Sequence, residues 1–135
     1  MEILKRILGI CKTKRPANPD CWRYIKGRVE VDLGLAVELV SPGDAIRLEG
    51  GDLGKERILV VCGESGTYHA YRNRCTHVGH RRIDTLPGES LLRCCSVSKS
   101  TYDYDGKVVS GPAGEPLTVL PAELGDGRLV IRLED

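Results

Sequence analysis

Apolar and polar residues alternate in short runs from Gly27 onward, a pattern typical of β-strands. The run ERILVVC at 56–62 is almost continuously apolar and predicts a buried strand. Other strand-like runs cover residues 28–33, 67–74, 91–95, 100–104, 107–111 and 128–133. Turns are predicted at 41–44, at 63–66 and at the Asp-Gly pairs 105–106 and 126–127. Because no long helical period separates these runs, the sequence predicts an all-β fold, a small antiparallel β-sandwich or barrel.

The first 27 residues have a different pattern. One apolar side of a short helix is predicted near the start, and glycine and prolines break the helical pattern after it; the residues concerned are Ile3, Leu4, Ile7, Leu8, Gly9, Pro16 and Pro19. A chain of 135 residues suits one domain. We therefore expect a basic N-terminal arm with a short helix over 1–27 and a single domain over 28–135.

Composition and charge narrow the function classes. The chain is 41% hydrophobic and contains no Phe, so the core is expected to consist of Val, Leu, Ile and a few Tyr. Up to Arg28 there are eight Lys or Arg residues against Glu2 and Asp20, a net charge of +6, which leaves about −5 on the remainder of a chain of net charge +1. Such an arm suits an acidic partner or an anionic membrane surface, or is simply a solvated terminus. It lacks the interleaved aromatic residues of nucleic-acid binding.

The expected location of the protein in the cell bears on the expected chemistry of its cysteines. No apolar stretch is long enough for a membrane span, and the basic, interrupted N-terminus lacks a cleavage site. We therefore expect a cytoplasmic protein. Its six cysteines are then expected to be ligands, core residues or thiols rather than a disulfide framework. Cys62 and Cys94 are expected in the core.

Residues that bind metals gather in two predicted loops. Cys75-Thr76-His77-Val78-Gly79-His80 offers a thiol and imidazoles after a strand, and Cys94-Cys95-Ser96-Val97-Ser98-Lys99 offers thiols from a second loop. The Cys-His pair has no third orienting group, so a cysteine nucleophile is not favoured and no catalytic site is predicted.

Beyond these loops, residues 36–133 resemble the Rieske family, whose motif is CxH, a gap, then CxxH. The resemblance extends through ILVVCGESGTYHAYRNRCTHVGH, the Tyr102-Asp103 pair, the Gly111-Pro112-Ala113 stretch and the last strand at 126–131. It implies a Rieske-like domain with a cluster-binding subdomain of two loops, a [2Fe-2S] cluster and single-electron transfer to a redox partner protein or oxidoreductase subunit. Tyr102 is expected to pack under the second loop.

The resemblance implies Cys75, His77 and Cys95 as ligands, but Ser98 stands where the family has its second histidine. A neutral hydroxyl is a poor iron ligand, so Ser98, His80 and Cys94 remain alternatives for the fourth position. Strand alternation argues against Cys94 because it directs neighbouring side chains to opposite faces. Two other interpretations stay open: a cluster-free Rieske-fold protein-interaction module, and a structural zinc site made of Cys75, His77, His80 and Cys95.

Overall fold

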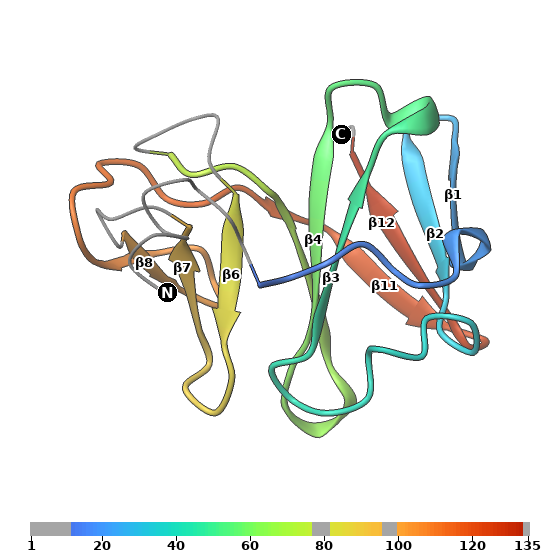
Figure 1. The fold of residues 1–135 in the computed structure, drawn as a ribbon, viewed down its shortest axis with the longest axis horizontal. Helices are drawn as coiled ribbons and strands as arrows, with labels where there is room; N and C mark the ends of the chain where they lie inside the picture. The colour runs from blue at the N-terminus through green and yellow to red at the C-terminus, as the bar shows by residue number, and fades with distance from the viewer. Residues whose placement is uncertain (1–11, 77–81, 96–99, 134–135) are drawn as a thin grey trace.

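The computed structural model describes residues 12–76, 82–95 and 100–133, and in these ranges the chain is all-β. Three antiparallel sheets of four strands each form three layers (Figure 1). Sheet A has the order β1-β2-β12-β11, with β1 Trp22–Ile25, β2 Arg28–Asp32, β12 Arg128–Arg132 and β11 Ala122–Gly125. Sheet B is β10-β5-β4-β3, with β10 Val119–Leu120, β5 Tyr68–Arg72, β4 Arg57–Cys62 and β3 Ala45–Glu49. Sheet C is β6-β7-β8-β9, with β6 Ile83–Leu86, β7 Leu91–Cys94, β8 Thr101–Asp103 and β9 Val108–Ser110.

The antiparallel all-β fold and the strands predicted from alternation are confirmed, and the predicted turns lie where expected. Five further strands were not predicted: β1, β3, β6, β10 and β11. The remaining elements are three 3-10 turns, η1 Pro19–Cys21, η2 Gly51–Leu53 and η3 Glu64–Gly66. The helix expected near the N-terminus lies outside the described residues, and no described helix has the length and apolar character of a membrane span.

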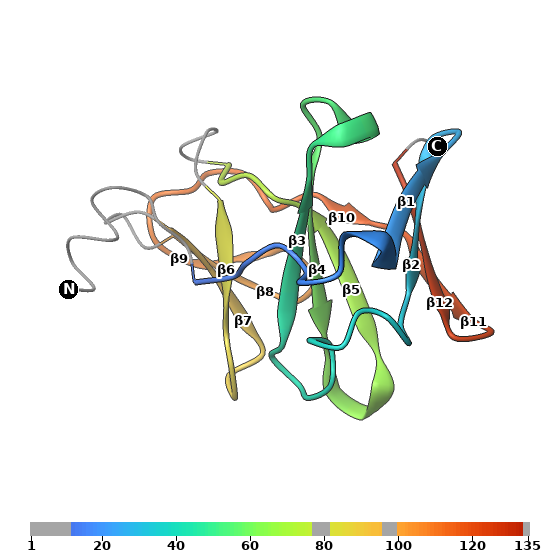
Figure 2. The same cartoon turned by 45° about the vertical axis from the view of Figure 1, so that its right-hand side comes forward.

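Sheet B is the middle layer, between sheet C on one side and sheet A on the other (Figures 1 and 2). Strand β4 has a continuously apolar sequence because it is buried on both faces. Ile58 and Val60 face the core shared with sheet A, whereas Leu59 and Val61 face the core shared with sheet C. As the composition predicted, branched aliphatic residues fill both cores, and the two buried tyrosines, Tyr71 and Tyr102, lie in the core shared with sheet C.

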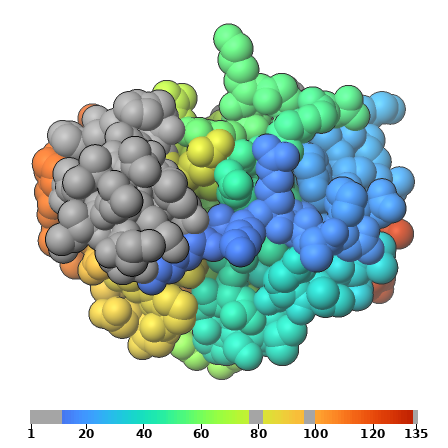
Figure 3. Space-filling model, in the orientation of Figure 1, coloured from blue at the N-terminus to red at the C-terminus, as the bar shows by residue number. Residues whose placement is uncertain are grey.

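The N-terminal segment is more integrated than an arm ending at residue 27. Strand β1 pairs with β2 through a two-residue turn at Lys26 and Gly27, which both have positive φ, so the hairpin crosses the expected boundary between 27 and 28. Upstream, the Lys14 carbonyl accepts a hydrogen bond from the Arg47 N–H at 3.0 Å. The N–H groups of Lys12 and Thr13 donate to the Asp84 carboxylate at 2.7 and 2.8 Å. Figure 3 shows this blue segment lying across the face of the molecule.

Candidate metal centre

The first of the two predicted ligand loops, which contains Cys75 and Thr76, follows β5, and Asn73 is hydrogen-bonded at both ends of it. The Asn73 N–H donates to the Arg57 carbonyl at 2.8 Å, which extends the β4 pairing by one residue. The Asn73 Oδ1 accepts from the Ile83 N–H at 2.7 Å, across the loop. Asn73 is 1% exposed, so this bridge is shielded from water. It sets the position from which Cys75 is presented.

Cys75 is completely buried, and its Sγ lies 3.6 Å from the hydroxyl oxygen of Tyr102 on β8. The same hydroxyl accepts from the Thr76 N–H at 3.2 Å and lies 3.0 Å from the Thr76 Oγ1. Thr76 in turn donates its hydroxyl to the Glu115 carbonyl at 2.7 Å. The first loop is therefore anchored to β8 through the Tyr102 phenol, in addition to the bond between Asn73 and Ile83.

Burial raises the pKa of Tyr102 to about 12, and the contact with Cys75 acts in the same direction, while the Thr76 contacts oppose it. The phenol consequently stays protonated at neutral pH. Because the Thr76 hydroxyl proton is committed to Glu115, the Tyr102 proton points to Thr76 Oγ1 or to the Cys75 sulfur. A deprotonated Cys75 sulfur would be the stronger acceptor.

The second predicted ligand loop, which begins at Cys95, comes directly after β7. The Cys94 N–H donates to the Ser100 carbonyl at 2.8 Å, which closes the base of this loop. The Cys95 N–H donates to the Arg82 carbonyl at 2.9 Å, immediately after the first loop. The described ends of the two loops are thus joined to one another, as expected if they belong to one site.

Cys75 and Cys94 differ from Cys95 in oxidation state and in the face of the sheet on which they lie. Cys75 and Cys94 belong to the same buried cluster as Ile83, Leu92 and Tyr102, and Cys94 stands opposite Ile83 in the ladder. Cys95 is not a member of that cluster, in keeping with strand alternation. Cys95 is 4% exposed and disulfide-bonded, with its partner outside the described residues. The other described cysteines, Cys21, Cys62, Cys75 and Cys94, are reduced thiols, so a single disulfide stands beside them and not a disulfide framework.

His77, His80 and Ser98, the remaining candidate ligands, lie outside the described residues. Within the ranges 12–76, 82–95 and 100–133, no group of three or more His, Cys, Asp or Glu side chains is arranged to hold a metal ion. The ligand set predicted from sequence therefore stays a prediction.

Cys62 and Cys94 lie in the core, as expected. Cys62 is a buried core residue, and burial raises the pKa of its thiol. His69 is half-buried on β5, with its ring centroid 5.0 Å from that of Tyr104, and burial lowers its pKa. The hydroxyl of Tyr102 contacts the first loop, whereas its expected packing under the second loop stays a prediction. Sequence spacing offered no signal for this contact, since Cys75 and Tyr102 are 27 positions apart.

Comparison with known proteins decides the family. The model of the Rieske [2Fe-2S] domain family matches residues 35–121. The chain belongs to this family. Its Rieske domain is 31% identical, over 77 residues, to the glycine betaine monooxygenase oxygenase subunit of Chromohalobacter salexigens. That match covers 57% of the chain and 17% of the relative, so the chain spans about a sixth of the length of that curated relative.

Solved Rieske structures share the fold. The apo form of the quaternary ammonium Rieske monooxygenase CntA superposes with a TM-score of 0.61 at 21% identity, over 87% of the chain and 42% of that protein. The ferredoxin of carbazole 1,9a-dioxygenase from Nocardioides aromaticivorans superposes with a TM-score of 0.56 at 15% identity, over 70% of the chain and 89% of that protein.

The described part of the Rieske domain fits the family's cluster in one half of the site. Cys75 offers a buried sulfur with a neutral phenol donor beside it, the environment in which a thiolate bound to iron is stabilised by a hydrogen bond. Cys95 lies at the joined end of the second loop but must be reduced before its sulfur can bind iron.

Proposed function

We propose that the chain is a Rieske-type iron-sulfur protein that carries single electrons through a [2Fe-2S] cluster with an atypical ligand set. Cys75 and Cys95 would hold one iron, and His77 with a residue at or near Ser98 would hold the other. Two observations support the proposal: the buried Cys75 sulfur lies against the Tyr102 hydroxyl, and the Cys95 N–H donates to the Arg82 carbonyl, which joins the second loop to the end of the first. A bound cluster supplies a centre that takes up and releases one electron.

The protein groups around Cys75 exclude water and orient the sulfur. Cys75 and Tyr102 are both 0% exposed, so charge on the sulfur is not solvated by bulk water. The Tyr102 hydroxyl, held neutral by its raised pKa, donates to that sulfur once the thiol proton is lost. Asn73 fixes the direction of the loop through its bond across to Ile83.

The fourth ligand is the atypical part of the proposal. Ser98 occupies the family's histidine position, and His80 and Cys94 are the other candidates. The buried cluster that Cys94 shares with Cys75 supports keeping Cys94 among them. Replacing Ser98 by His supplies the usual ligand, and we expect the Ser98→His variant to bind iron more completely. Unchanged iron content and colour in that variant would show that ligation at this position is not limiting.

The test of the cluster is iron and sulfide analysis of reduced protein after anaerobic reconstitution. About two irons and two sulfides per chain are expected, with visible absorption. The Cys75→Ala variant should bind neither iron nor sulfide and should lack the visible absorption. Cys62→Ala, which removes a cysteine buried in the other core, is the matched control and should retain them. Colourless reconstituted protein would refute the proposal. Near-stoichiometric zinc, with loss of stability on chelation, would favour the structural zinc site instead.

A cluster-free protein-interaction module is the second candidate, and the disulfide at Cys95 favours it, because a sulfur held in a disulfide is no iron ligand. This candidate predicts a folded protein whose stability does not change on reconstitution. Circular dichroism melting before and after reconstitution, with reductant present in both samples, separates it from the cluster proposal.

We further propose a redox partner within a cytoplasmic oxidoreductase system. Two of the similar proteins are an oxygenase subunit and a ferredoxin, and this supports the choice of a redox partner. The basic N-terminal region would contact an acidic partner or a membrane surface through its lysines and arginines.

A further inference from the structure

The disulfide at Cys95 has one candidate partner in the sequence. The chain contains six cysteines, and the structure describes five of them. Four of these five carry no disulfide: Cys21, Cys62, Cys75 and Cys94. Cys95 is the fifth and is disulfide-bonded. Because the structure is that of a single chain, the partner belongs to the same molecule. Cys11 is the one cysteine of the sequence outside the described residues.

The N-terminal segment reaches sheet C at the residue that follows Cys11. The Lys12 N–H belongs to the peptide group that joins residues 11 and 12, and it donates to the Asp84 carboxylate on β6 at 2.7 Å. The Thr13 N–H donates to the other oxygen of that carboxylate at 2.8 Å. Two charge-assisted hydrogen bonds to one carboxylate fix both the position and the direction of the segment at this point.

Cys95 lies on the same face of sheet C as Asp84, two positions further along the ladder. Ile83 stands opposite Cys94, and both belong to the core shared with sheet B. Side chains alternate between the two faces of a strand, so Asp84 points to the other face. The hydrogen bond from the Cys95 N–H to the Arg82 carbonyl at 2.9 Å continues the ladder by one pair, so Cys95 also points to that other face.

The span that remains suits a disulfide. Two positions along a strand correspond to about 7 Å, and the Cα atoms of two disulfide-bonded cysteines lie about 4.4–6.8 Å apart. A cysteine one residue before Lys12 therefore reaches Cys95 without any movement of the described segment.

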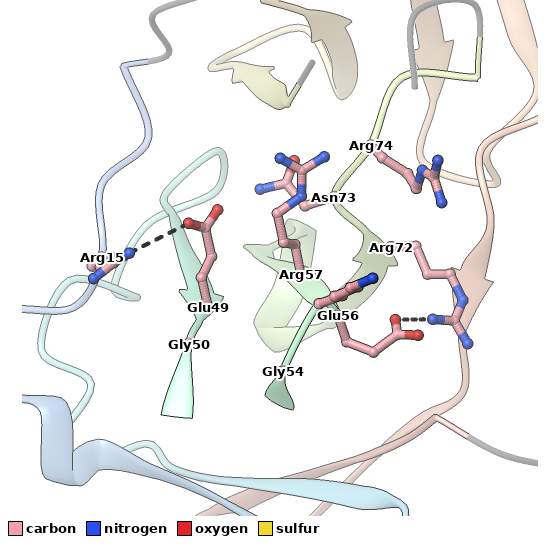
Figure 4. Close-up of a pocket in the computed structure, with 10 residues that line it drawn as sticks. Arg15, Glu49, Gly50, Gly54, Glu56, Arg57, Arg72, Asn73 and Arg74 are labelled. Atoms are coloured by element: carbon pink, nitrogen blue, oxygen red, sulfur yellow. Dashed lines mark hydrogen bonds and ion pairs between the residues drawn. The ribbon is translucent and has the colours of Figure 1, made fainter. Parts of the chain in front are cut away.

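Contacts to sheet B hold the same segment in place further along. The Lys14 carbonyl accepts from the Arg47 N–H on β3 at 3.0 Å. Arg15 pairs with Glu49 at 3.6 Å, as Figure 4 shows. Glu49 also accepts a hydrogen bond from Arg82, which directly precedes β6, at 3.0 Å. Residues 12–15 thus join β3 of sheet B to β6 of sheet C and approach the second predicted ligand loop.

We propose that Cys11 and Cys95 form a reversible disulfide that controls whether Cys95 is available to bind iron. The role in iron binding rests on the proposed cluster, whereas the disulfide does not. While the sulfur–sulfur bond exists, the Cys95 sulfur has no thiolate form that could bind iron. The disulfide therefore makes cluster binding depend on the thiol redox state of the surroundings.

A dithiol reductant and a disulfide oxidant switch the pair between its two states. Cys95 is 4% exposed, so the sulfur of Cys11 is the one that a thiolate of the reductant attacks. A mixed disulfide with Cys11 forms, and Cys95 leaves as a thiolate. The second thiol of the reductant then displaces Cys11. Two electrons and two protons pass from the reductant, which becomes a disulfide, to the two cysteines. Glutathione disulfide reverses this exchange and is itself reduced to two thiols.

Peptide mapping of the full chain without iron tests the pairing. The protein is equilibrated anaerobically in oxidised or reduced glutathione buffer, alkylated in denaturant and digested with trypsin. In the oxidised buffer, we expect peptide 7–12 to be linked to peptide 94–99 through Cys95, with Cys94 alkylated. In the reduced buffer, all six cysteines should be alkylated.

Three results of the mapping would overturn the proposal. In the first, Cys95 stays alkylatable in every buffer. In the second, Cys95 is linked to glutathione or to a cysteine other than Cys11. In the third, dithiothreitol does not break the link in the native protein. The Cys11→Ala variant should lack the linked peptides. Cys21→Ala, which removes the other cysteine of the N-terminal region, is the matched control and should form the link as the unchanged chain does.

Iron release tests the role of the disulfide in iron binding. Glutathione disulfide is added anaerobically to reduced, cluster-loaded protein. Iron should leave the unchanged chain at least about tenfold faster than the Cys11→Ala variant, because a thiol of the same chain acts at a high effective concentration. Equal rates would overturn this role. Failure of every reduced form to bind iron would refute the cluster proposal instead, and the peptide map would still decide whether the disulfide exists.

Discussion

Replacing Tyr102 by Phe removes one hydroxyl from a side chain that is 0% exposed and leaves the ring in place. The hydroxyl has three neighbours in the first ligand loop: the Thr76 N–H at 3.2 Å, the Thr76 Oγ1 at 3.0 Å and the Cys75 Sγ at 3.6 Å. Because the ring stays, the variant isolates what the Tyr102 hydroxyl contributes to holding this loop against β8.

The expected loss of stability is about 2 kcal/mol, because a donor left without an acceptor costs about 1–3 kcal/mol. The Thr76 N–H loses its acceptor, while the Thr76 hydroxyl keeps its bond to the Glu115 carbonyl. The Cys75 thiol adds little, since sulfur is a weak hydrogen-bond partner. Thr76 is half-buried, so water reaches part of the site and keeps the loss away from the upper end of that range.

Urea unfolding measures this loss. With a slope of about 1–3 kcal/mol per molar urea, the midpoint should fall by about 1 M. Tyr71→Phe is the matched control, because Tyr71 is equally buried and its hydroxyl donates a single hydrogen bond, to the Tyr104 carbonyl at 2.7 Å. The Tyr71→Phe change should lower the free energy of unfolding by about 1 kcal/mol. If Tyr102→Phe costs no more than Tyr71→Phe, the hydroxyl does not anchor the loop.

Two further predictions concern charge and backbone. Burial acts to raise the pKa of Glu49, but hydrogen bonding and charge from Arg82, with other arginines, outweigh it and lower the pKa below its ordinary 4.5. The stability from Glu49 is therefore present above pH 4.5 and lost as pH falls through the lowered folded value. Urea midpoints across acidic pH should fall less steeply in Glu49→Gln, and an identical slope would refute this role. Gly106→Ala should cost at least about 2 kcal/mol more than Gly127→Ala in thermal unfolding. Both glycines have positive φ, but only at Gly106 would the new Cβ meet the Leu117 carbonyl oxygen, so equal costs would contradict the prediction.

Local sequence patterns show which segments form strands and which form turns. The continuous apolar run at 56–62 and the Asp-Gly turns were readable because strand and turn preferences act over a few residues. Two of the unpredicted strands have weak local signals, since β1 comes after a proline-rich basic stretch and β6 has only four residues. Strand β3, by contrast, alternates polar and apolar residues and could have been predicted. The pairing of β6 and of the C-terminal strands depends on partners that the local sequence does not reveal.

The amino-acid sequence was sufficient to predict an all-β fold, because alternation and turns are properties of short segments. Its resemblance to the Rieske family then implied the Rieske fold and the two cysteine-bearing loops. Three-dimensional packing was needed to show that the Tyr102 hydroxyl lies against Cys75, that Asn73 bridges to Ile83, and that the N-terminal segment reaches β6 at Asp84. These arrangements join residues far apart along the chain, and the packing of sheet B between two other sheets is what brings them together.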